Sequence, residues 1–353
     1  EVDAVLICLP TPLDEHRNPD LSIVAAGAEE VARHVRRGAL IVLESTTYPG
    51  TTRELLQPIF ERDGRRVGED FFLAFSPERV DPGNRRHTVK NTPKVVGGIT
   101  PKCAGRAEKL YRRIVREVHV VSTPESAEFS KLLENIFRGV NIALVNELAI
   151  LCDRMGVDVW EVIDAASTKP FGFMPFLPGP GLGGHCIPVD PFYLSWRAKA
   201  YGLSTEFIEL AGRVNVNMPY YAASRVFRAL NDEGKAVKGS KVLVMGVSYK
   251  PDVADLRESP SLKLLELLRG AGARICYHDS RVPILPEWGL SSIELTEEEI
   301  RESDCVVIAT DHSDVDLRPV IAAAPKVVDL RNAVRRRLGG RPNGPLPLNV
   351  EVL

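Results

Sequence analysis

Residues 122–155 read STPESAEFSKLLENIFRGVNIALVNELAILCDRM. Ser122 and Thr123 are N-cap candidates, Pro124 suits the first turn of a helix, and apolar residues then recur at helical spacing to the end of the stretch. This pattern predicts one long helix. Because short apolar strands alternate with helical segments on both sides of it, residues 122–232 are predicted to form a central helical region between two α/β regions.

The N-terminal region, residues 1–121, contains apolar strands such as 4–9 and 71–75 between helical segments. Continuous apolar strands separated by helices are typical of a parallel sheet with helices on both faces, so we predict a Rossmann-like domain. Glu1 is followed almost at once by a strand, and no G-x-G-x-x-G fingerprint follows a strand anywhere in the sequence. We therefore expect this domain to be truncated at its N-terminus.

A second α/β region starts at residues 241–246, KVLVMG, and predicts a second Rossmann-like domain over residues 236–335. Residues 336–353 begin within the basic run Arg335-Arg336-Arg337 and are then rich in proline and glycine, which predicts a solvated, mobile tail. The predicted fold class is therefore α/β, with two doubly wound Rossmann-like domains joined by the central helical region.

The composition excludes several classes of protein. Of 353 residues, 44% are hydrophobic, which argues against disorder, and 45 Lys+Arg against 47 Asp+Glu give a net charge of −2, which argues against a nucleic-acid binder. No apolar run approaches the ~20 residues that cross a bilayer, so no membrane span is expected. The six cysteines show no disulfide-framework spacing and no secretory leader is evident, which favours the cytoplasm.

Cys186 lies in the loop Gly183-Gly184-His185-Cys186-Ile187-Pro188-Val189-Asp190, with glycines before it and a carboxylate four residues after it. Glycines let backbone approach a substrate closely, and a thiol beside a base is a candidate nucleophile. The alternative is an inert loop cysteine. Zinc binding by Cys186 and His185 is disfavoured because no partner pair occurs at ligand spacing, so no metal is predicted.

Polar residues on the long helix and after one strand are further candidates. Lys131 and Asn135 are four residues apart on the predicted helix and share one face, where they form either a polar site or a solvated edge. Glu78, with Arg79 beside it, follows the strand 71–75 at its carboxyl end, where open α/β sheets bind ligands. The alternative for Glu78 is an exposed loop carboxylate.

Two more polar segments follow strands. Glu44-Ser45-Thr46-Thr47 offers hydroxyls that could contact a ribose or nicotinamide, or could cap the next helix. Residues 246–260 lie between a strand and a helix and carry Lys250 and Arg257, which suits a phosphate or diphosphate. The alternative is that these charges pair with one another. Arg331 ends a later strand at what should be the same edge of the sheet.

Together these motifs resemble the UDP-glucose/GDP-mannose dehydrogenase family, and within it the branch that acts on UDP-N-acetylhexosamines. Any one motif is weak, but seven occur in the family's order. They are Leu9-Pro10-Thr11-Pro12, residues 45–51 (STTYPGT), 75–79 (FSPER), 131–135 (KLLEN), 179–190 (GPGLGGHCIPVD), 249–260 and 329–332 (DLRN).

The resemblance implies an NAD-dependent oxidoreductase that converts the C6 alcohol of a UDP-N-acetylhexosamine, with UDP-N-acetylglucosamine first among them, to a carboxylate for surface polysaccharide. Two NAD⁺ are used and an aldehyde is the intermediate. Cys186 would trap that aldehyde and then carry a thioester. Lys131 and Asn135 would hold a water and stabilise the oxyanion, and Glu78 and Asp190 would transfer protons.

The resemblance also implies binding residues and a partner. Thr11, Thr46, Glu78 and Arg257 match cofactor contacts. The implied substrate contacts are Glu78, Arg79, Lys131, Asn135, Leu177, Gly181, Gly183, Lys250 and Arg331. The C-terminal domain would receive the nucleotide end of the UDP-sugar, and the central helices would form the interface of a homodimer.

Some features depart from the family pattern. Without the glycine-rich fingerprint, the printed chain is expected to bind NAD poorly. His185 and Val189 differ from the UDP-glucose and GDP-mannose branches, which favours an N-acetyl sugar, and Lys169 lies where many members offer an arginine from a neighbouring subunit. The alternatives are UDP-N-acetylmannosamine or UDP-glucose as substrate, or a UDP-sugar binder without activity. A two-electron dehydrogenase of the β-hydroxyacid type is disfavoured, because it needs neither Cys186 nor the second Rossmann-like domain.

Overall fold

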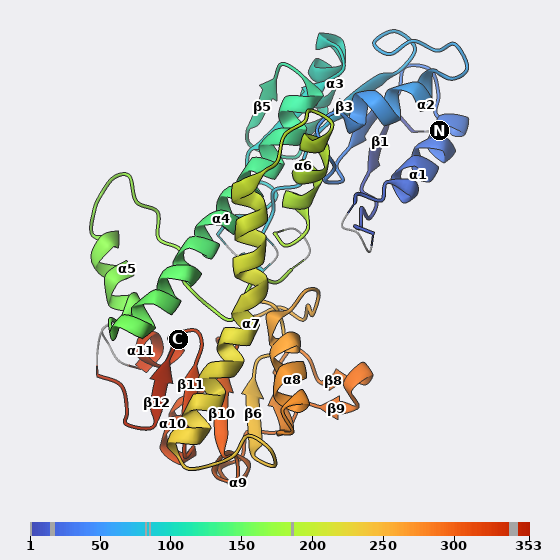
Figure 1. The fold of residues 1–353 in the computed structure, drawn as a ribbon. Coiled ribbons are helices and arrows are strands. Elements are labelled where there is room, and N and C mark those ends of the chain that lie inside the picture. The colour runs from blue at the N-terminus through green and yellow to red at the C-terminus, as the bar shows by residue number, and fades with distance from the viewer. Residues whose placement is uncertain (1, 15–17, 82, 85, 185–186, 339–344) are drawn as a thin grey trace. The chain divides into compact units, whose positions relative to one another are not determined.

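The computed structural model describes residues 2–14, 18–81, 83–84, 86–184, 187–338 and 345–353 (Figure 1). The chain divides into two compact units, the first comprising residues 1–138 and 189–208 and the second residues 139–188 and 209–353. The domain boundaries expected from the sequence, 1–121, 122–232 and 236–335, stay predictions.

The first unit contains a five-stranded sheet in the order β1-β2-β3-β4-β5. Its elements are β1 (Ala4–Ile7), α1 (Ser22–His34), β2 (Leu40–Leu43), the π-helix η1 (Thr52–Leu56), α2 (Gln57–Glu61), β3 (Phe72–Phe75), β4 (Lys94–Gly98), α3 (Pro101–Tyr111), β5 (Val118–Val121), the first part of α4 (Pro124–Met155) and α6 (Asp190–Lys199). Strands β1 to β3 are parallel, as are β4 and β5, but β3 and β4 are antiparallel.

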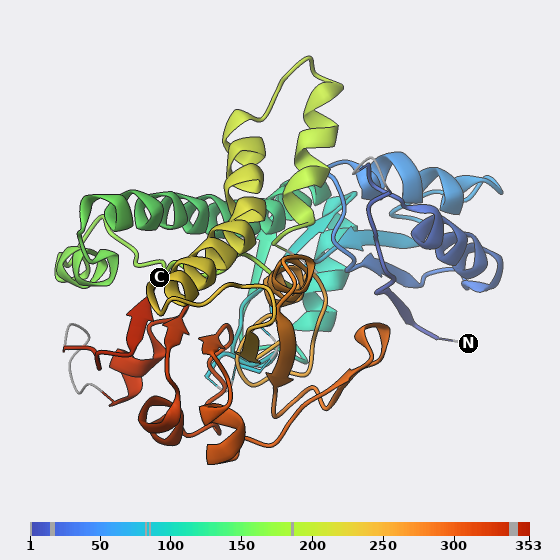
Figure 2. The ribbon, with the colours of Figure 1, turned by 60° about the horizontal axis from the view of Figure 1, so that its bottom comes forward.

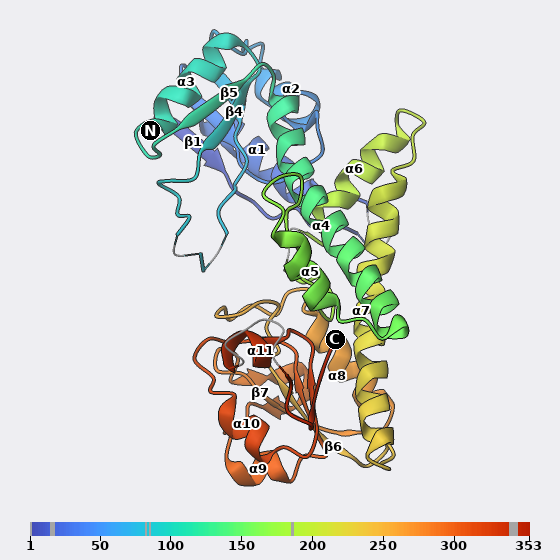
Figure 3. The same ribbon diagram turned by 90° about the vertical axis from the view of Figure 1, so that its left-hand side faces the viewer.

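The antiparallel pair corrects the prediction of a wholly parallel sheet. A parallel connection needs a crossover, usually a helix, and the described part of the segment between β3 and β4 contains no helix, so the chain turns back on itself there. Helices cover both faces of the sheet (Figure 3). Ile41 and Leu43 pack with α1, η1 and α2, whereas Leu40 and Val42 pack with α3. The α/β fold class is confirmed.

The second unit contains a parallel sheet in the order β12-β11-β10-β6-β7 (Figure 2). Its elements are the rest of α4, α5 (Val159–Ser167), α7 (Glu206–Asp232), β6 (Lys241–Met245), α8 (Pro260–Gly270), β7 (Arg274–His278), β8 (Ile284–Leu285), the 3-10 helix η2 (Pro286–Trp288), β9 (Leu290–Ser291), α9 (Glu297–Arg301), β10 (Cys305–Ile308), α10 (Arg318–Ala323), β11 (Val327–Asp329), α11 (Ala333–Leu338) and β12 (Val350–Val352). The strand order reverses between β6 and β10, where doubly wound sheets bind ligands.

The expectation of a solvated tail over residues 336–353 is wrong for the last residues, whereas residues 336–338 are exposed at the end of α11. Residues 350–352 form β12, which pairs in parallel with β11, and Leu353 is 5% exposed while its carbonyl accepts a hydrogen bond from the Trp160 indole. Within α11, Arg335 pairs with Asp158 of α5. Burial of a few apolar side chains at the edge of the sheet holds this segment, although its composition resembles a loop.

Helix α4 has two contrasting faces. Glu128, Lys131 and Asn146 are buried and share one side of the helix. On the opposite side, exposed apolar residues recur within about 100° of the helix circumference. These residues, the α4 stripe, are Phe129, Leu133, Phe137, Leu144, Leu148, Leu151 and Met155. By length and composition α4 could also cross a membrane, with 33% of its most apolar window buried, which qualifies the expectation that the chain has no such segment.

The start of α4 depends on a glycine in β4. A Cβ at Gly97 would lie 2.2 Å from the backbone carbonyl oxygen of Thr123, directly before the helix. We expect Gly97→Ala to lower the free energy of unfolding by about 1–3 kcal/mol, because backbone must move to admit the methyl group. Gly105→Ala is the control: Gly105 lies in α3 with open space around it, and alanine there should raise stability by about 0.5–1 kcal/mol. Urea denaturation of both variants measures this, and equal effects would contradict it.

Candidate functional site

The loops after β1 and β2 are tied together at the carboxyl edge of the first sheet. The backbone N–H of Leu9 donates to the Ser45 hydroxyl at 2.8 Å, and this hydroxyl donates to the Leu9 carbonyl at 2.7 Å. The Tyr193 hydroxyl, from α6, donates to the Thr11 carbonyl at 2.6 Å. Thr11 and Thr46, two of the predicted cofactor contacts of this unit, therefore lie in neighbouring loops on one edge of the sheet.

Glu128 holds the segment that follows Thr46, and the sequence analysis missed it. Its carboxylate accepts hydrogen bonds from the backbone N–H of Gly50 at 2.6 Å and of Thr52 at 2.9 Å, and from the Thr52 hydroxyl at 2.7 Å. Burial raises the pKa of Glu128 to about 7 despite these bonds, which lower it. Its position three residues before Lys131, on the same helix face, was the available signal.

Lys131, Asn135 and Asp190 form a polar cluster. The Asn135 amide donates to the Asp190 carboxylate, and Asp190 is 4% exposed at the start of α6. Burial raises the pKa of Asp190 to about 7, while the Lys131 ammonium and the Asn135 hydrogen bond oppose the rise. A carboxyl group with this pKa exists in both protonation states at neutral pH, so it can accept and return a proton.

Glu78 and Arg79 follow β3, as predicted. The Glu78 carboxylate accepts hydrogen bonds from the backbone N–H of Arg79 at 2.7 Å and lies 3.3 Å from the Lys94 ammonium. Burial alone would raise the pKa of Glu78, but Lys94 and the backbone N–H groups lower it. Arg79 pairs with Glu134 of α4 at 2.8 Å, and Glu78 lines a cavity of about 180 Å³ together with Glu44. Glu78 is therefore an ionised carboxylate at neutral pH.

In the second unit, the glycine loop 177–184 is anchored to two buried amides. The backbone N–H of Gly179 donates to the Asn146 side-chain oxygen at 3.0 Å, and the Asn146 amide donates to Asn215 of α7 at 3.0 Å. Asn215 in turn donates to the Gly139 carbonyl at 3.1 Å. The sequence analysis missed both asparagines, because no local pattern distinguishes them from surface residues of a helix.

The same loop lies against the predicted substrate residues. A Cβ at Gly179 would lie 2.5 Å from a guanidinium nitrogen of Arg331, and one at Gly183 would lie 2.5 Å from the Cβ of Tyr249. The backbone N–H of Gly184 donates to the Arg257 carbonyl at 2.9 Å. Only glycine permits these approaches without displacing a neighbour. The glycine loop and the segment that carries Lys250 and Arg257 are thus packed together.

The remaining predicted residues of this unit have defined places. Leu177 is 44% exposed, and Gly181 has a φ of +135°. The side chain of Arg257 makes an ion pair with Asp255 at 2.6 Å. Lys169 lies 4.9 Å above the Phe171 ring.

The two predicted substrate cations of the second unit lie beyond the ends of strands in its sheet. Lys250 follows β6, with its ammonium 5.7 Å from the Tyr249 ring centre, and Arg331 follows β11, where its Nε donates to the Ala309 carbonyl at 2.8 Å. Burial lowers the pKa of Arg331 to about 10, while Asp329 raises it, so the guanidinium stays charged at neutral pH. Cys186 and His185 lie outside the described residues.

Comparisons with known proteins identify the family. Residues 1–115 match the NAD binding domain, residues 125–217 the central domain and residues 243–336 the UDP binding domain of the UDP-glucose/GDP-mannose dehydrogenase family. The chain belongs to this family.

Individual relatives agree with the family match. A UDP-N-acetyl-D-glucosamine 6-dehydrogenase of Pseudomonas aeruginosa is 39% identical over 80% of this chain and 65% of its own length. A UDP-N-acetyl-D-mannosamine dehydrogenase of Pyrococcus horikoshii is 38% identical over 88% of this chain and 71% of its own length. A solved UDP-D-ManNAc dehydrogenase from the same organism aligns with a TM-score of 0.87 at 34% identity, covering 99% of this chain and 80% of its own. The chain therefore spans between 65% and 80% of the length of these relatives.

The family's cofactor fits the first unit. The Thr47 hydroxyl, beside Thr46 at the carboxyl end of β2, is buried without a hydrogen-bond partner among the described residues. Such an orphaned group at the edge of a parallel sheet is expected where a polar ligand completes the hydrogen bonding. Thr11 and Thr46 would hold NAD there. Of the other predicted cofactor contacts, Glu78 belongs to the same unit and Arg257 to the second unit.

One group of described residues has the composition of a metal site. Side-chain atoms of Asp252, His312 and Asp314 lie within 4.8 Å of one another. Each is already engaged: the imidazole accepts from the backbone N–H of Asp252, the Asp252 carboxylate accepts from Ser313, and Asp314 pairs with Arg281. The group therefore offers no free set of ligands, and the expectation of no metal stays a prediction.

The raised pKa of Asp190 predicts a pH-dependent stability. The carboxyl group titrates near pH 7 when folded and near pH 3.8 when unfolded, so between these values the folded protein binds more protons and its stability falls as pH rises. Asparagine cannot ionise. We expect Asp190→Asn to stabilise the protein relative to wild type by an amount that grows by roughly 3 kcal/mol from pH 5 to pH 8.

Urea denaturation at pH 5, 6, 7 and 8 measures this difference. Asp316→Asn is the control, because the hydrogen bond from Arg318 lowers the pKa of Asp316 to about 2 and the group stays ionised over the whole range. Its effect should not change with pH. If the effect of Asp190→Asn on the free energy of unfolding did not change with pH, the pKa of Asp190 would not be raised in the folded protein.

Proposed function

We propose that this chain is an NAD-dependent 6-dehydrogenase of UDP-N-acetylhexosamines, with UDP-N-acetylglucosamine as its substrate, and that it oxidises the C6 alcohol to a carboxylate. The observation that carries this proposal is the cluster of Lys131, Asn135 and Asp190, which joins the long helix to the segment that begins four residues after Cys186. A cation, an amide donor and a carboxyl group that titrates near neutral pH suit acyl chemistry at a thiol.

In the proposed reaction, each residue of the site has its own role. NAD held by the first unit would supply the hydride acceptor for both oxidations at the sugar C6. After the first oxidation the Cys186 sulfur would add to the aldehyde carbon, and the aldehyde oxygen would take up a proton to give a thiohemiacetal. The second oxidation would remove a hydride from that carbon and the proton from its hydroxyl group, which leaves a thioester. Water then attacks the thioester carbon, the C–S bond breaks, and the thiol and a carboxylate result. Asp190 takes the proton from that water, while Lys131 and Asn135 stabilise the oxyanion.

The second unit would bind the nucleotide end of the substrate. Lys250 and Arg331 offer fixed cations beyond the carboxyl ends of β6 and β11, and the backbone of the glycine loop offers close contact without side chains. Glu78, Arg79, Leu177, Gly181 and Gly183 complete the proposed substrate contacts, and Glu78 also the cofactor contacts. The resemblance to the family supports these contacts, and substitution of each residue tests it.

The choice of sugar rests on named relatives. The Pseudomonas aeruginosa relative is a UDP-N-acetyl-D-glucosamine 6-dehydrogenase, and others are named for N-acetyl-D-mannosamine and N-acetyl-D-galactosaminuronic acid. All of these are N-acetyl sugars, which favours this class over UDP-glucose. The second candidate is therefore UDP-N-acetylmannosamine, which differs at a single stereocentre.

We also infer a cytoplasmic homodimer formed through the central helices. The α4 stripe exposes seven large apolar side chains on one helix face, opposite the face that carries Lys131. A contiguous apolar face of this kind marks an interface, and a second copy offers the same face by two-fold symmetry. A partly buried helix with Glu128 and Asn146 on its inner side suits this role better than a membrane span.

The decisive test of the reaction is the amount of NADH formed per UDP-N-acetylglucosamine consumed, measured at end point with the protein expressed from its complete gene. We expect two NADH per sugar and a uronate product. One NADH per sugar would contradict the thioester scheme. Binding of UDP-N-acetylglucosamine in calorimetry with no turnover would favour the non-catalytic binder, and turnover of UDP-N-acetylmannosamine alone would favour the second candidate.

The role of Cys186 has its own prediction. We expect Cys186→Ser to lower uronate formation by at least about a thousandfold while the affinity for the UDP-sugar stays within about twofold, because a hydroxyl is a far weaker nucleophile than a thiolate. Product analysis and calorimetry measure the two quantities. Cys152→Ser is the control, since Cys152 lies partly buried on α4 and should leave turnover unchanged. Full turnover by Cys186→Ser would contradict the covalent mechanism.

The proposed dimer interface at the α4 stripe predicts that a substitution there will lower the mass of the protein in solution. We expect Leu133→Glu to convert the dimer to a monomer in sedimentation velocity, because a carboxylate cannot be desolvated at the centre of an apolar contact. Ile284→Glu is the matched control: Ile284 has the same 57% exposure as Leu133 but lies in β8, outside the α4 stripe. A dimeric Leu133→Glu, or a monomeric Ile284→Glu, would contradict this interface.

A further inference from the structure

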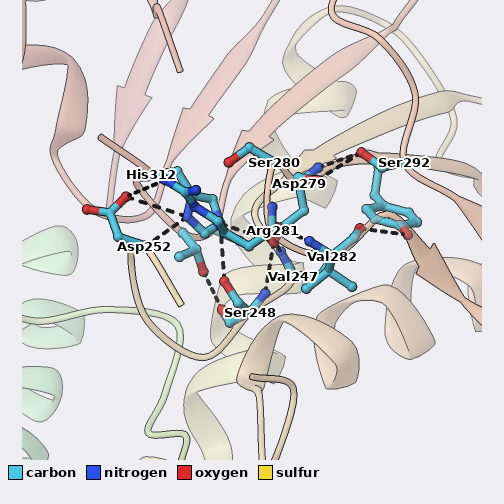
Figure 4. A network of polar contacts seen from close by, with 12 residues as sticks. Val247, Ser248, Asp252, Asp279, Ser280, Arg281, Val282, Ser292 and His312 are labelled. Atoms are coloured by element: carbon cyan, nitrogen blue, oxygen red, sulfur yellow. Dashed lines mark hydrogen bonds and ion pairs between the residues drawn. The ribbon is translucent and has the colours of Figure 1, made fainter. Parts of the chain in front are cut away.

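His312 is a buried imidazole at the carboxyl end of the second sheet, beyond β10, and the proposed function does not use it. Its side chain is 1% exposed, and it lies between Asp252 on one side and Ser248 and Asp279 on the other (Figure 4). Ser248 and Asp252 bound the loop that follows β6, and Lys250 lies between them. We call residues 247–252 the lysine loop.

The hydrogen bonds of His312 determine its tautomer. The backbone N–H of Asp252 donates to Nδ1 at 3.0 Å, so Nδ1 carries no proton. On the other side, the Ser248 hydroxyl donates to the Lys250 carbonyl at 3.2 Å, which leaves its oxygen to accept from Nε2–H at 3.1 Å. The Asp279 carboxylate accepts from the same Nε2–H at 3.1 Å. Nε2 is therefore the nitrogen that donates, to Ser248 and Asp279, and Nδ1 is the one that accepts.

Neighbouring strand ends complete the attachment of the lysine loop. Asp279, after β7, accepts from the backbone N–H of Ser248 at 3.1 Å, and the Thr310 hydroxyl, after β10, donates to the Ser248 carbonyl at 2.7 Å. At the other end of the loop, Asp252 has a φ of +63°, a conformation that costs a non-glycine residue energy, and its carboxylate accepts from Ser313 at 2.9 Å. His312 is the side chain that contacts both ends.

The lysine loop lies where a nucleotide should bind. It leaves β6 beside β10, at the point where the strand order of the sheet reverses. Within it, Tyr249 packs against Gly183 of the glycine loop, so the backbone that carries Lys250 also supports the proposed substrate loop. A cation on a flexible loop would lose entropy on binding a phosphate, whereas a loop held at both ends has already lost it.

We propose that His312 is a positioning residue for UDP-sugar binding, which holds the lysine loop so that Lys250 meets the diphosphate of the nucleotide. The inference rests on the proposed function, because it takes the second unit to be the site of the nucleotide. His312 touches neither substrate nor cofactor and acts through the backbone on either side of Lys250.

Calorimetric titration of the chain with UDP tests the proposal, because UDP needs neither NAD nor Cys186. We expect His312→Leu to weaken UDP binding about tenfold. A tenfold change in affinity corresponds to the free energy of about one hydrogen bond to a charged group. His312→Asn, whose amide oxygen can replace the Nδ1 acceptor, should recover part of the affinity. His278→Leu is the matched control: His278 ends β7, and its Nδ1 bonds to the Ile293 carbonyl at 2.8 Å rather than to the lysine loop within the described residues, so its loss should leave the affinity unchanged.

A double-mutant cycle separates positioning from general destabilisation. If His312 acts through Lys250, the variant carrying both His312→Leu and Lys250→Ala binds UDP no more weakly than Lys250→Ala alone. Additive losses, or wild-type affinity in a folded His312→Leu variant, would overturn the inference while leaving the proposed function intact. If His312→Leu does not fold, Ser248→Ala removes the hydroxyl that joins the imidazole to the Lys250 carbonyl, and unchanged affinity there overturns it equally. A wild-type chain that does not bind UDP would overturn the proposed function itself, and this inference with it.

Discussion

The buried polar side chains of α4 must each find a hydrogen-bond partner, and the partners they find are the segments that carry the proposed site. A buried polar group without a partner costs about 1–3 kcal/mol, and more if it is charged. Glu128 satisfies this constraint with the backbone of Gly50 and Thr52, Asn135 with Asp190, and Asn146 with the backbone of Gly179. One face of one helix therefore sets the places of three segments that are far apart in the sequence.

Burial also gives different pKa values to carboxyl groups that are chemically alike. Asp190 and Glu128 are almost fully buried, and the loss of hydration raises the pKa of each to about 7. Glu78 is partly exposed beside the Lys94 ammonium, which lowers its pKa. At neutral pH Glu78 is consequently a fixed negative charge, whereas Asp190 can exchange a proton. Differences in environment, rather than in residue type, thus suit Asp190 to proton transfer and Glu78 to holding a ligand.

In the second unit, the polar side chains at the ends of the strands also find their hydrogen-bond partners in one another. The loops after β6, β7 and β10 contribute Ser248, Asp279 and His312 to one closed network, in which both imidazole nitrogens have partners (Figure 4). Such a network holds the backbone of the lysine loop in place. Lys250 and Arg331 are the cations that we propose to bind the UDP-sugar. They lie at the same edge of the sheet, because parallel strands direct the loops that follow them to one side.

The sequence by itself determined the elements and motifs whose signals are local. The spacing of apolar residues predicted α4, the alternation of strands and helices predicted the α/β class, and turn residues located the glycine loop before Cys186, because each signal lies within one helix or turn. The tertiary structure alone decided the antiparallel pair of β3 and β4, the return of residues 350–352 to the sheet, and the partners of Glu128, Asn146 and His312. These depend on contacts between residues tens of positions apart, and no local pattern encodes which buried polar group will meet which.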